Sequence, residues 1–478
     1  MKKGYITIFL SLSLTLILSL VFTVIEGARI SAIRMKFECA TDIGMNSILA
    51  EYHRELLEQY DLLFVDTSYG GSIPSIANTE EHLRKYIQEN FNSRGKSIFR
   101  RTRDFLDMNV ESIELTEYSI ASDEDGDVLK RQISDYMADY PVGNILARIT
   151  GNFAQVESSQ METRNVESER ESAQSQIDEI DLPLQEMEDG TYEEVPLDNP
   201  ADAANATRSI GVLNLVVDDI DSISTTKIMQ EQYISGRTLM RGSGTCTEAE
   251  SVSGTSNEIL FLAYLFDKCG YYGAEKEDAM LQYQIEYIIA GKDTDWQNLE
   301  QIAKRLLKWR EAANVLYIMS DGAKVAEAEA MALALTAVML CPELVEPVKY
   351  TILFAWAYVE SLQDVKDLFG GGRVPIYKTA SDWKTGINSI KNVKGSLKDS
   401  EDSGRGLSYK EYLEIMLFLM NSHDKTFRAM DIMEMDIRKT PGNSDFRLDG
   451  CFDTYRARLA VTSGFGYSYE MERLYGFY

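Results

Sequence analysis

The residues able to carry chemistry in this sequence are few and scattered. Three histidines, His53, His82 and His423, stand far apart, and the five cysteines show no C-x-x-C spacing. Structural zinc sites bring cysteines together at such spacing. Neither the G-x-S-x-G elbow nor the H-E-x-x-H helix of known hydrolases occurs. The sequence therefore predicts no catalytic residue, no metal site and no cofactor, so we expect the protein not to be an enzyme.

Two short segments resemble binding loops without completing them. Residues 94–97 (RGKS) match the end of a phosphate-binding loop, but the first glycine of that motif falls on Asn90. Residues 123–127 (DEDGD) alternate carboxylates as calcium loops do. Positions 6 and 12 of that loop need glycine and glutamate, and here they hold Val128 and Ser134. We expect no nucleotide site at the first segment and an acidic turn at the second.

Composition excludes several classes of protein. The chain has 478 residues, with 76 acidic against 48 basic residues and a net charge of −28. Such an acidic chain is poorly suited to grip phosphate backbones, so no nucleic-acid partner is expected. A hydrophobic share of 44% excludes a disordered chain, and five cysteines are too few for a disulfide framework. The length suffices for two or three domains of about 150 residues.

The strongest signal is an uncharged apolar run over residues 5–25. At about 1.5 Å per residue the run covers about 31 Å, enough to cross the hydrocarbon core of a membrane. Lys2 and Lys3 precede it, which favours a cytoplasmic N-terminus and an extracytoplasmic bulk, although Arg29 follows on the other side. We expect a single-pass cell-membrane protein. The alternative is a cleaved signal peptide, whose apolar region is about 7–15 residues and ends at a small-x-small site.

Small residues recur every four positions along this run. The row comprises Thr7, Ser11, Thr15, Ser19, Thr23 and Gly27. Such a row drifts by about 40° per step around a helix, and small residues let two helices approach closely. The row predicts a helix-packing seam for self-association or for a pilin-like partner. The alternative is that its hydroxyls bond carbonyls four residues earlier in the same helix.

Helical spacing of apolar residues continues beyond the apolar run. Residues from Ile30 to Tyr60 keep a three-to-four spacing, and no proline interrupts residues 5–73. This pattern predicts one helix from residue 5 to about residue 60, membranous in its first half and amphipathic in its second. That is the general shape of a pilin-type N-terminal helix.

The N-terminus also resembles a prepilin leader. Lys2-Lys3-Gly4 places basic residues and a glycine directly before the apolar run. Prepilin-type peptidases cut after such a glycine, which implies cleavage between Gly4 and Tyr5. Many type IV pilins have a glutamate five residues into the mature chain that pairs with the new amine, whereas here Phe9 occupies that position.

Further segments resemble TadE/TadG-like proteins of Tad (Flp) pilus loci, and more closely an uncharacterised family of Gram-positive anaerobes encoded near such genes. The similar segments are residues 26–29 (EGAR), 60–64 (YDLLF), 286–292 (EYIIAGK), 356–361 (WAYVES) and 428–434 (RAMDIME). The resemblance implies a membrane-anchored, pseudopilin-like protein of pilus assembly, with pilin-like or Tad assembly proteins as partners. It implies no catalytic residues.

The sequence predicts a helix-rich α+β protein in which a long N-terminal helix precedes an extracytoplasmic region. Its expected parts are a prepilin-like leader (1–4), a transmembrane helix (5–25), a helix continuing outside the membrane (26–62), a small α+β region (63–155), an acidic linker (156–204) and a mainly helical domain with C-terminal β-hairpins (205–478). Residues 156–200 hold 14 acidic residues against two arginines and no lysine, which favours a solvated linker.

Several elements outside the N-terminus can be predicted from periodicity. Residues 110–121 and 282–287 alternate as strands do. Helical patterns cover 295–320, 323–340, 344–369 and 407–437, and we expect the alanine-rich helix 323–340 to be the central core helix. Three functions stay open: a pilus-associated structural subunit, an anchored surface-binding module that never enters a filament, and a cell-wall-acting enzyme with a polar cleft.

Overall fold

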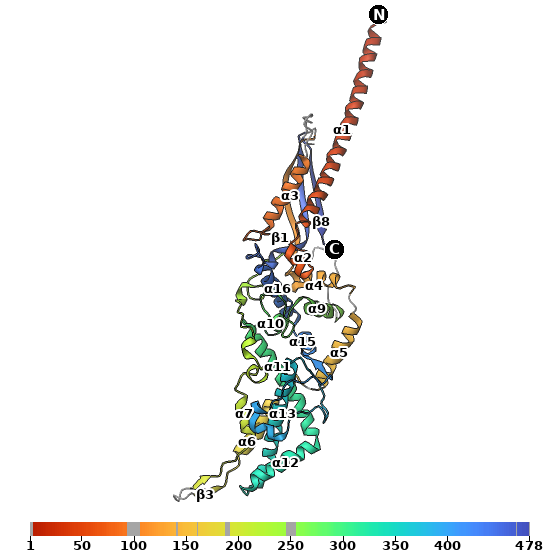
Figure 1. Ribbon diagram of the computed structural model, residues 1–478. Helices are drawn as coiled ribbons and strands as arrows, with labels where there is room; N and C mark the ends of the chain where they lie inside the picture. Colours follow the sequence, from red (N-terminus) through yellow and green to blue (C-terminus); the bar gives the residue numbers. More distant parts are fainter. Residues whose placement is uncertain are drawn as a thin grey trace. The chain divides into compact units, whose positions relative to one another are not determined.

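The computed structural model describes residues 3–92, 106–139, 142–159, 161–186, 192–244, 255–464 and 466–477. Helices predominate and small antiparallel sheets accompany them, which confirms the predicted helix-rich α+β class (Figure 1). The chain forms two compact units that exchange segments. The sheet unit comprises Met1–Tyr136, Gly236–Val252 and Met433–Tyr478, and the helical unit comprises Met137–Ser235 and Ser253–Ile432. The predicted separation into residues 63–155 and 205–478 is therefore wrong.

The sheet unit is built around one four-stranded antiparallel sheet. Its elements are α1 (Lys3–Leu49), α2 (Arg54–Tyr60), β1 (Val65–Asp66), α3 (Ile76–Phe91), β2 (Met108–Ile120), α4 (Asp123–Tyr136), η5 (Leu448–Gly450), β7 (Cys451–Ser463) and β8 (Ser468–Gly476). Strand β7 is central: β2 pairs with it from Met108↔Ser463 to Ile120↔Phe452, and β1 and β8 also pair with it. The predicted strand at 110–121 and the C-terminal hairpin are confirmed.

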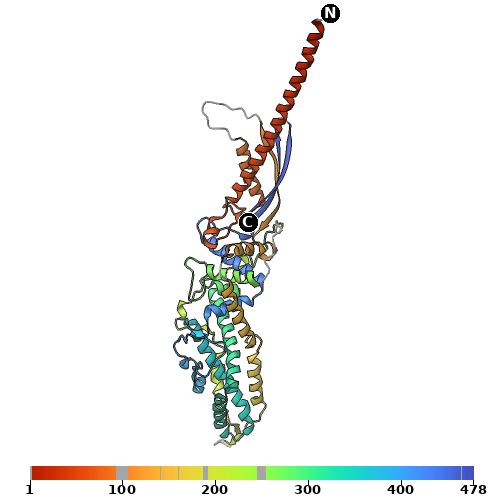
Figure 2. The same cartoon turned by 90° about the vertical axis from the view of Figure 1, so that its right-hand side faces the viewer.

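The second half of α1 packs with α3 on this sheet, whereas its first half extends beyond it (Figure 2). Ile33, Phe37 and Ile48 are buried in a core shared with Leu83 of α3 and Leu459 of β7. Each apolar side chain that faces this core is removed from water, which is the main driving force for the packing.

Helix α1 ends at Leu49, so the prediction of one helix to about residue 60 is wrong. The backbone N–H of His53 donates to the Phe64 carbonyl at 2.8 Å, and Tyr52 forms an antiparallel bridge with Val65. The backbone here is therefore extended rather than helical. A new helix, α2, then begins with the His53 imidazole accepting from the Leu56 N–H as the N-cap.

The short segment 236–252 returns to the sheet unit through an ion-pair cluster. Arg237 donates to the Glu434 carboxylate, with one N···O distance of 2.7 Å, and also pairs with Asp449. Both carboxylates are buried. Because two buried acids need a cationic partner, Arg237 fixes the point at which this segment rejoins the unit.

The helical unit contains most of the remaining helices. Its elements are α5 (Val142–Ser158), α6 (Val166–Asp178), β3 (Leu184–Glu186), β4 (Tyr192–Glu194), α7 (Ala201–Thr207), α8 (Leu213–Val216), η1 (Ile220–Ser222), η2 (Gln230–Gln232), α9 (Thr255–Lys268), α10 (Gln284–Ala290), α11 (Asp295–Ser320), α12 (Gly322–Ala337), η3 (Pro342–Leu344), α13 (Val345–Phe369), β5 (Arg373–Val374), η4 (Ile387–Asn392), α14 (Val393–Ser396), β6 (Leu407–Ser408) and α15 (Tyr409–Phe418). Helix α16 (Ser422–Lys439) begins in this unit and ends in the sheet unit.

Helix α13 is the central helix of this unit, and α11, α12, α6 and α7 pack around it. In α12 the buried positions are only Ala328, Ala332 and Thr336, so the expectation of a central alanine-rich helix is wrong. The small side chains of α12 let it lie close against α13, while its remaining faces stay in solvent.

The acidic segment 156–204 is not a solvated linker. Its helix α6 buries Val166, Ala173 and Ile177 against the helical unit, and some of its acids are paired, as in Arg164–Glu169 at 2.7 Å. An acidic helix with one apolar face can dock when arginines neutralise part of its charge.

Two further predictions need correction. Residues 282–287 belong mostly to helix α10 rather than to a strand, because Gln284 and Glu286 are buried as well as the apolar positions between them. The predicted helix 407–437 is interrupted at residues 419–421, between α15 and α16.

Candidate functional sites in the sheet unit

The first half of α1 is the most unusual surface of the described chain. The helix Gly4–Leu49 is the one described helix that is long and apolar enough to cross a membrane, and its most apolar stretch has no buried residue. Leu16 and Phe9, for example, are 72% and 71% exposed. A protein in water does not leave such a surface uncovered without a reason. By length and composition the helix fits a membrane anchor or a signal sequence.

The predicted packing seam lies on this exposed half and touches nothing else in the described chain. The hydroxyls of Thr7, Thr15 and Thr23 each donate to a carbonyl one turn earlier, those of Gly4, Ser11 and Ser19, at 2.8–2.9 Å. Such bonds within one helix are what the alternative interpretation of the row predicts, in which the hydroxyls bond carbonyls of their own helix. A Cβ atom added at Gly27 would meet nothing within 4 Å, so the row remains accessible to another helix. The seam stays a prediction.

The predicted leader cleavage point lies in the first turn of α1. Gly4 and Tyr5 are both helical, and the Tyr5 side chain is 78% exposed. No contact in the described chain covers the bond between them. The geometry thus leaves the bond open to a peptidase, and cleavage stays a prediction.

Two tyrosines tie β8 to α1: Tyr467, the residue directly before the strand, and Tyr475 within it. The Tyr467 hydroxyl donates to the Glu26 carboxylate, and the Tyr475 hydroxyl donates to Asp42 Oδ1 at 2.9 Å. Glu26 also pairs with Arg29 at 2.9 Å. Nothing in the local sequence signals these contacts, because the partners lie 441 and 433 residues apart.

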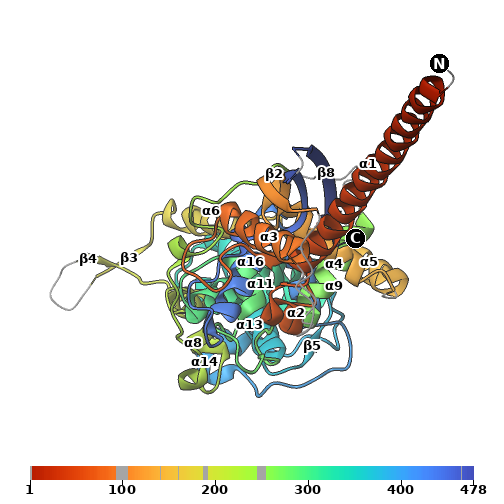
Figure 3. The same ribbon diagram turned by 90° about the horizontal axis from the view of Figure 1, so that it is seen from above.

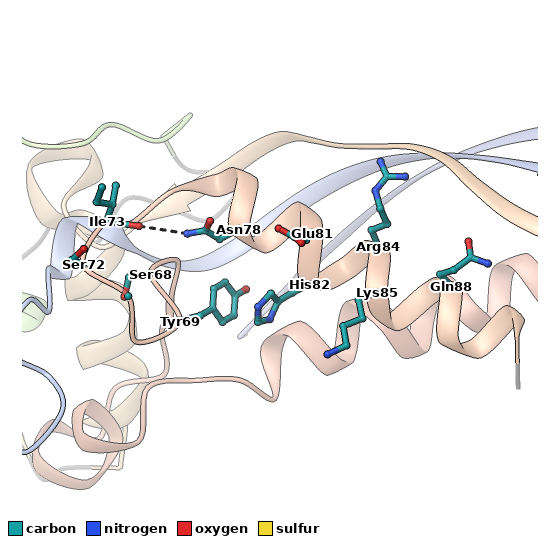
Figure 4. Close-up of a pocket in the computed structure, with 11 residues that line it drawn as sticks. Ser68, Tyr69, Ser72, Ile73, Asn78, Glu81, His82, Arg84, Lys85 and Gln88 are labelled. Carbon is teal, nitrogen blue, oxygen red and sulfur yellow. Dashed lines mark hydrogen bonds between the residues drawn. The ribbon is translucent and has the colours of Figure 1, made fainter.

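A second candidate site is a polar cleft of about 820 Å³ between α3 and the loop before it (Figure 4). The Tyr69 ring stacks on the His82 ring with centroids 3.9 Å apart, and the cleft also contains Lys85 and Gln88. The His82 Nδ1 lies 3.1 Å from Glu51 Oε2. Glu51 therefore orients the imidazole at the edge of the cleft.

Hydrogen bonds hold the aromatic side of the cleft in place. The Tyr86 hydroxyl donates to Glu51 at 2.7 Å, and this bond is the main cause that raises the pKa of Tyr86 to about 12. Burial raises the pKa of Tyr69, whose hydroxyl donates to Thr79 at 3.2 Å. Both phenols therefore stay protonated at neutral pH and serve as hydrogen-bonding groups rather than bases.

The serine and the histidine of the cleft have separate hydrogen-bond partners. The Ser68 hydroxyl donates to Asp66 Oδ2 at 2.6 Å, whereas His82 bonds Glu51, so the described hydrogen bonds do not form a serine–histidine pair. Over the described residues no group of three or more histidine, cysteine or acidic side chains could hold a metal ion. Sequence analysis missed the cleft because Glu51, Tyr69 and His82 carry no shared motif.

The remaining chemistry-bearing residues are dispersed. His53 caps α2, and His423 stacks on Phe427 with centroids 4.1 Å apart. Cys269 and Cys451 are buried, whereas Cys39 is exposed and Cys341 is half-buried. Cys246 and the segment 94–97 lie outside the described residues.

The acidic segment at residues 123–127 forms the predicted turn. Its backbone is left-handed at Glu124, Asp125 and Gly126, with φ of 52°, 56° and 81°. The buried Asp123 carboxylate accepts backbone N–H groups of Ile120 and Gly242, both at 3.0 Å. This carboxylate joins β2 to the returning segment 236–252.

The fold and these sites define a helix-rich α+β protein with an apolar helical segment left outside its own core. The chain belongs to a protein family of unknown function (DUF5702), whose sequence profile matches residues 190–463, more than half of the chain. The match covers most of the helical unit and reaches the end of β7. No curated protein and no solved structure matches the chain.

Proposed function

We propose that this protein is a membrane-anchored extracytoplasmic structural protein, a pseudopilin-like or accessory component of Tad/Flp-type pilus assembly. One observation carries the proposal: α1 is divided into a fully exposed apolar half and a half packed on an antiparallel sheet. Pilin-type subunits need this division, because one part of the helix must lie in lipid or against neighbouring subunits while the other part holds a globular head.

The proposed topology is a single span with a cytoplasmic N-terminus. Lys2 and Lys3 precede the span, and basic residues favour the cytoplasmic side. The sheet unit and the helical unit then both lie outside the cell membrane. In this arrangement Thr15 and Ser19 of the small-residue row face lipid and are available to a second helix.

The test is the N-terminal mass of the native protein together with its presence in sheared pili. We expect a mature chain that starts at Tyr5, and an unprocessed chain in cells that lack the prepilin-type peptidase. A Gly4→Val variant should stay unprocessed in the presence of the peptidase. An intact start combined with normal pili in cells lacking the protein would contradict a pilin-type role.

The cleft beside α3 supports a second candidate function, an anchored surface-binding module. Its stacked Tyr69 and His82 and the cationic Lys85 offer an aromatic face and polar groups to a ligand such as a cell-wall glycan. Binding of purified wall glycan that is lost in Tyr69→Ala and kept in Tyr136→Ala, an exposed tyrosine outside the cleft, would favour this candidate. Pilus incorporation without such binding would favour the first.

A further inference from the structure

The end of the β7–β8 hairpin meets α1 where its apolar run stops. Tyr467, the residue directly before β8, donates its hydroxyl to Glu26. Glu26 is the first charged residue after the uncharged residues 5–25. The hairpin therefore reaches the boundary between the apolar and the polar part of α1. Figure 3 shows β8 beside α1.

A second contact fixes the hairpin along the helix. Tyr475 donates to Asp42 on the same helix at 2.9 Å. The two tyrosines are eight strand residues apart, about 26 Å at about 3.3 Å per residue. Glu26 and Asp42 are sixteen helix residues apart, about 24 Å at about 1.5 Å per residue. Because the two lengths agree, β8 runs alongside α1 and holds the hairpin end at the level of Glu26 (Figure 1).

The side chains at this end are those that favour a membrane surface. Tyr467 and Tyr469 lie on the face of the hairpin that contacts the core of the sheet unit, and both remain partly exposed. Tyrosine is enriched at membrane–water interfaces because its ring is apolar and its hydroxyl is polar. Arg29, one turn after Glu26, and Arg34, with 72% of its side chain exposed, lie close by and pair with Glu26 and Glu38.

We propose that the Tyr467–Tyr469 end of the hairpin rests in the lipid headgroup layer of the membrane that α1 spans. The headgroup layer is about 5–8 Å deep on each side of the hydrocarbon core. Glu26 follows the apolar run directly, so Tyr467 lies at that depth, while Tyr475 lies about 24 Å farther out. The inference rests on the part of the proposed function in which α1 is a membrane span.

Such a contact would set the depth and orientation of the sheet unit. The unit would stand on the bilayer through two adjacent points, the span and the hairpin end, instead of hanging on a flexible linker. Interfacial tyrosines contribute to this contact through burial of their rings.

The test uses the full-length protein in vesicles of phosphatidylcholine and phosphatidylglycerol that carry bromine on the upper acyl chain. A tryptophan near the interface loses fluorescence to bromine. The reporter variants are Tyr467→Trp and Tyr469→Trp, the second of which keeps the bond between Tyr467 and Glu26. The matched control is Tyr475→Trp on the same strand, and Phe22→Trp reports the span itself. The four native tryptophans all lie in the helical unit, and their signal is subtracted with the unsubstituted protein.

We expect loss of reporter fluorescence at positions 22, 467 and 469 and none at position 475. Quenching at position 22 without quenching at positions 467 and 469 would overturn the hairpin inference and leave the membrane span standing. Absence of quenching at position 22 would overturn the span, and with it both the inference and the proposed function.

Discussion

The apolar half of α1 and helix α13 are both rich in apolar residues, but the first is exposed and the second is buried. Every residue from Pro347 to Phe369 in α13 except Tyr350 is buried, whereas residues 5–25 of α1 are almost all exposed. Helix α13 nevertheless carries buried charges such as Glu360 and Asp364, and residues 5–25 carry none. A protein core accepts charges that meet partners, but lipid offers no partner. The distribution of charge therefore separates a buried core helix from an exposed apolar helix better than mean hydropathy does.

The charges of α13 are neutralised by a compact cluster. Arg310 Nε lies 2.9 Å from Asp364 Oδ2, and Lys378 pairs with Asp364 at 2.5 Å and with Glu360. Lys378 and Arg310 together lower the pKa of Asp364 against its burial. The cluster makes α13 dependent on residues of α11 and of the loop after β5.

The largest expected effect comes from breaking this cluster. Arg310→Met leaves Asp364 with one cationic partner fewer in a buried site, and we expect a loss of about 3–5 kcal/mol in the free energy of unfolding. Denaturant unfolding of the detergent-solubilised chain, followed by circular dichroism, measures it. Lys304→Met on the same helix removes a half-exposed pair with Glu300 and should cost less than about 1 kcal/mol. Equal losses in the two variants would contradict the role assigned to burial.

The next largest effect is expected on membrane insertion of the apolar half of α1. A charge in the middle of the apolar run, Leu14→Arg, should cost about 2.5–3.5 kcal/mol of membrane insertion and move protein out of the membrane fraction. Met35→Arg, at an exposed position beyond the run, should leave insertion unchanged. Fractionation after an alkaline wash measures both. Retention of Leu14→Arg at the level of the unsubstituted chain would argue that residues 5–25 do not lie in lipid.

Buried acids in the helical unit should also make the free energy of unfolding depend on pH. Burial raises the pKa of Glu286 from 4.5 to about 7, against bonds donated by the Tyr272 N–H at 2.9 Å and the Tyr409 hydroxyl at 2.7 Å. The folded state thus holds a proton that the unfolded state releases between these two pH values. Stability should fall as the pH rises from 4.5 through about 7, by up to about 3 kcal/mol.

The variant Glu286→Gln removes the titrating group and should flatten this part of the pH profile. Unfolding free energies measured across the same pH range give the comparison. An unchanged slope in Glu286→Gln would show that another group causes the pH dependence.

The smallest expected effect concerns the small-residue row. Thr15→Leu combined with Ser19→Leu should weaken self-association of the span by about 0.6–2 kcal/mol, because leucine side chains keep helix backbones apart. The sheet unit should be unaffected, since neither residue contacts it. Energy transfer between labelled copies in vesicles measures association, with Leu18→Val as a control outside the row. Unchanged association would remove the seam from the proposal.

Local signals explain what could be predicted from the sequence. Apolar residues at helical spacing predict helix α11 at residues 295–320, and the structure shows that Thr294 caps its N-terminus. Strand β2 and the β7–β8 hairpin follow from alternation. The exposed apolar half of α1 follows from the absence of charge.

The errors arise where distant residues decide the structure. Helix α12 has the more apolar sequence, but α13 became central because Arg310 and Lys378 neutralise its acids from elsewhere in the chain. The acidic helix α6 packs on the helical unit through three buried side chains. Its high acidic content led the sequence analysis to predict a solvated linker instead. The bond between Tyr467 and Glu26 depends on the register of a strand against a helix, which no local pattern encodes.

The proposed retention of the apolar helix is tested most directly by the N-terminal mass of the native protein recovered from membranes after an alkaline wash. We predict a membrane-bound chain that begins at Tyr5 or earlier and so keeps residues 5–25. A start at Tyr5 would also support the pilin export route. A soluble chain whose first residue lies beyond Ile25 would mean that the apolar run is a removed signal peptide, and it would contradict the membrane anchor.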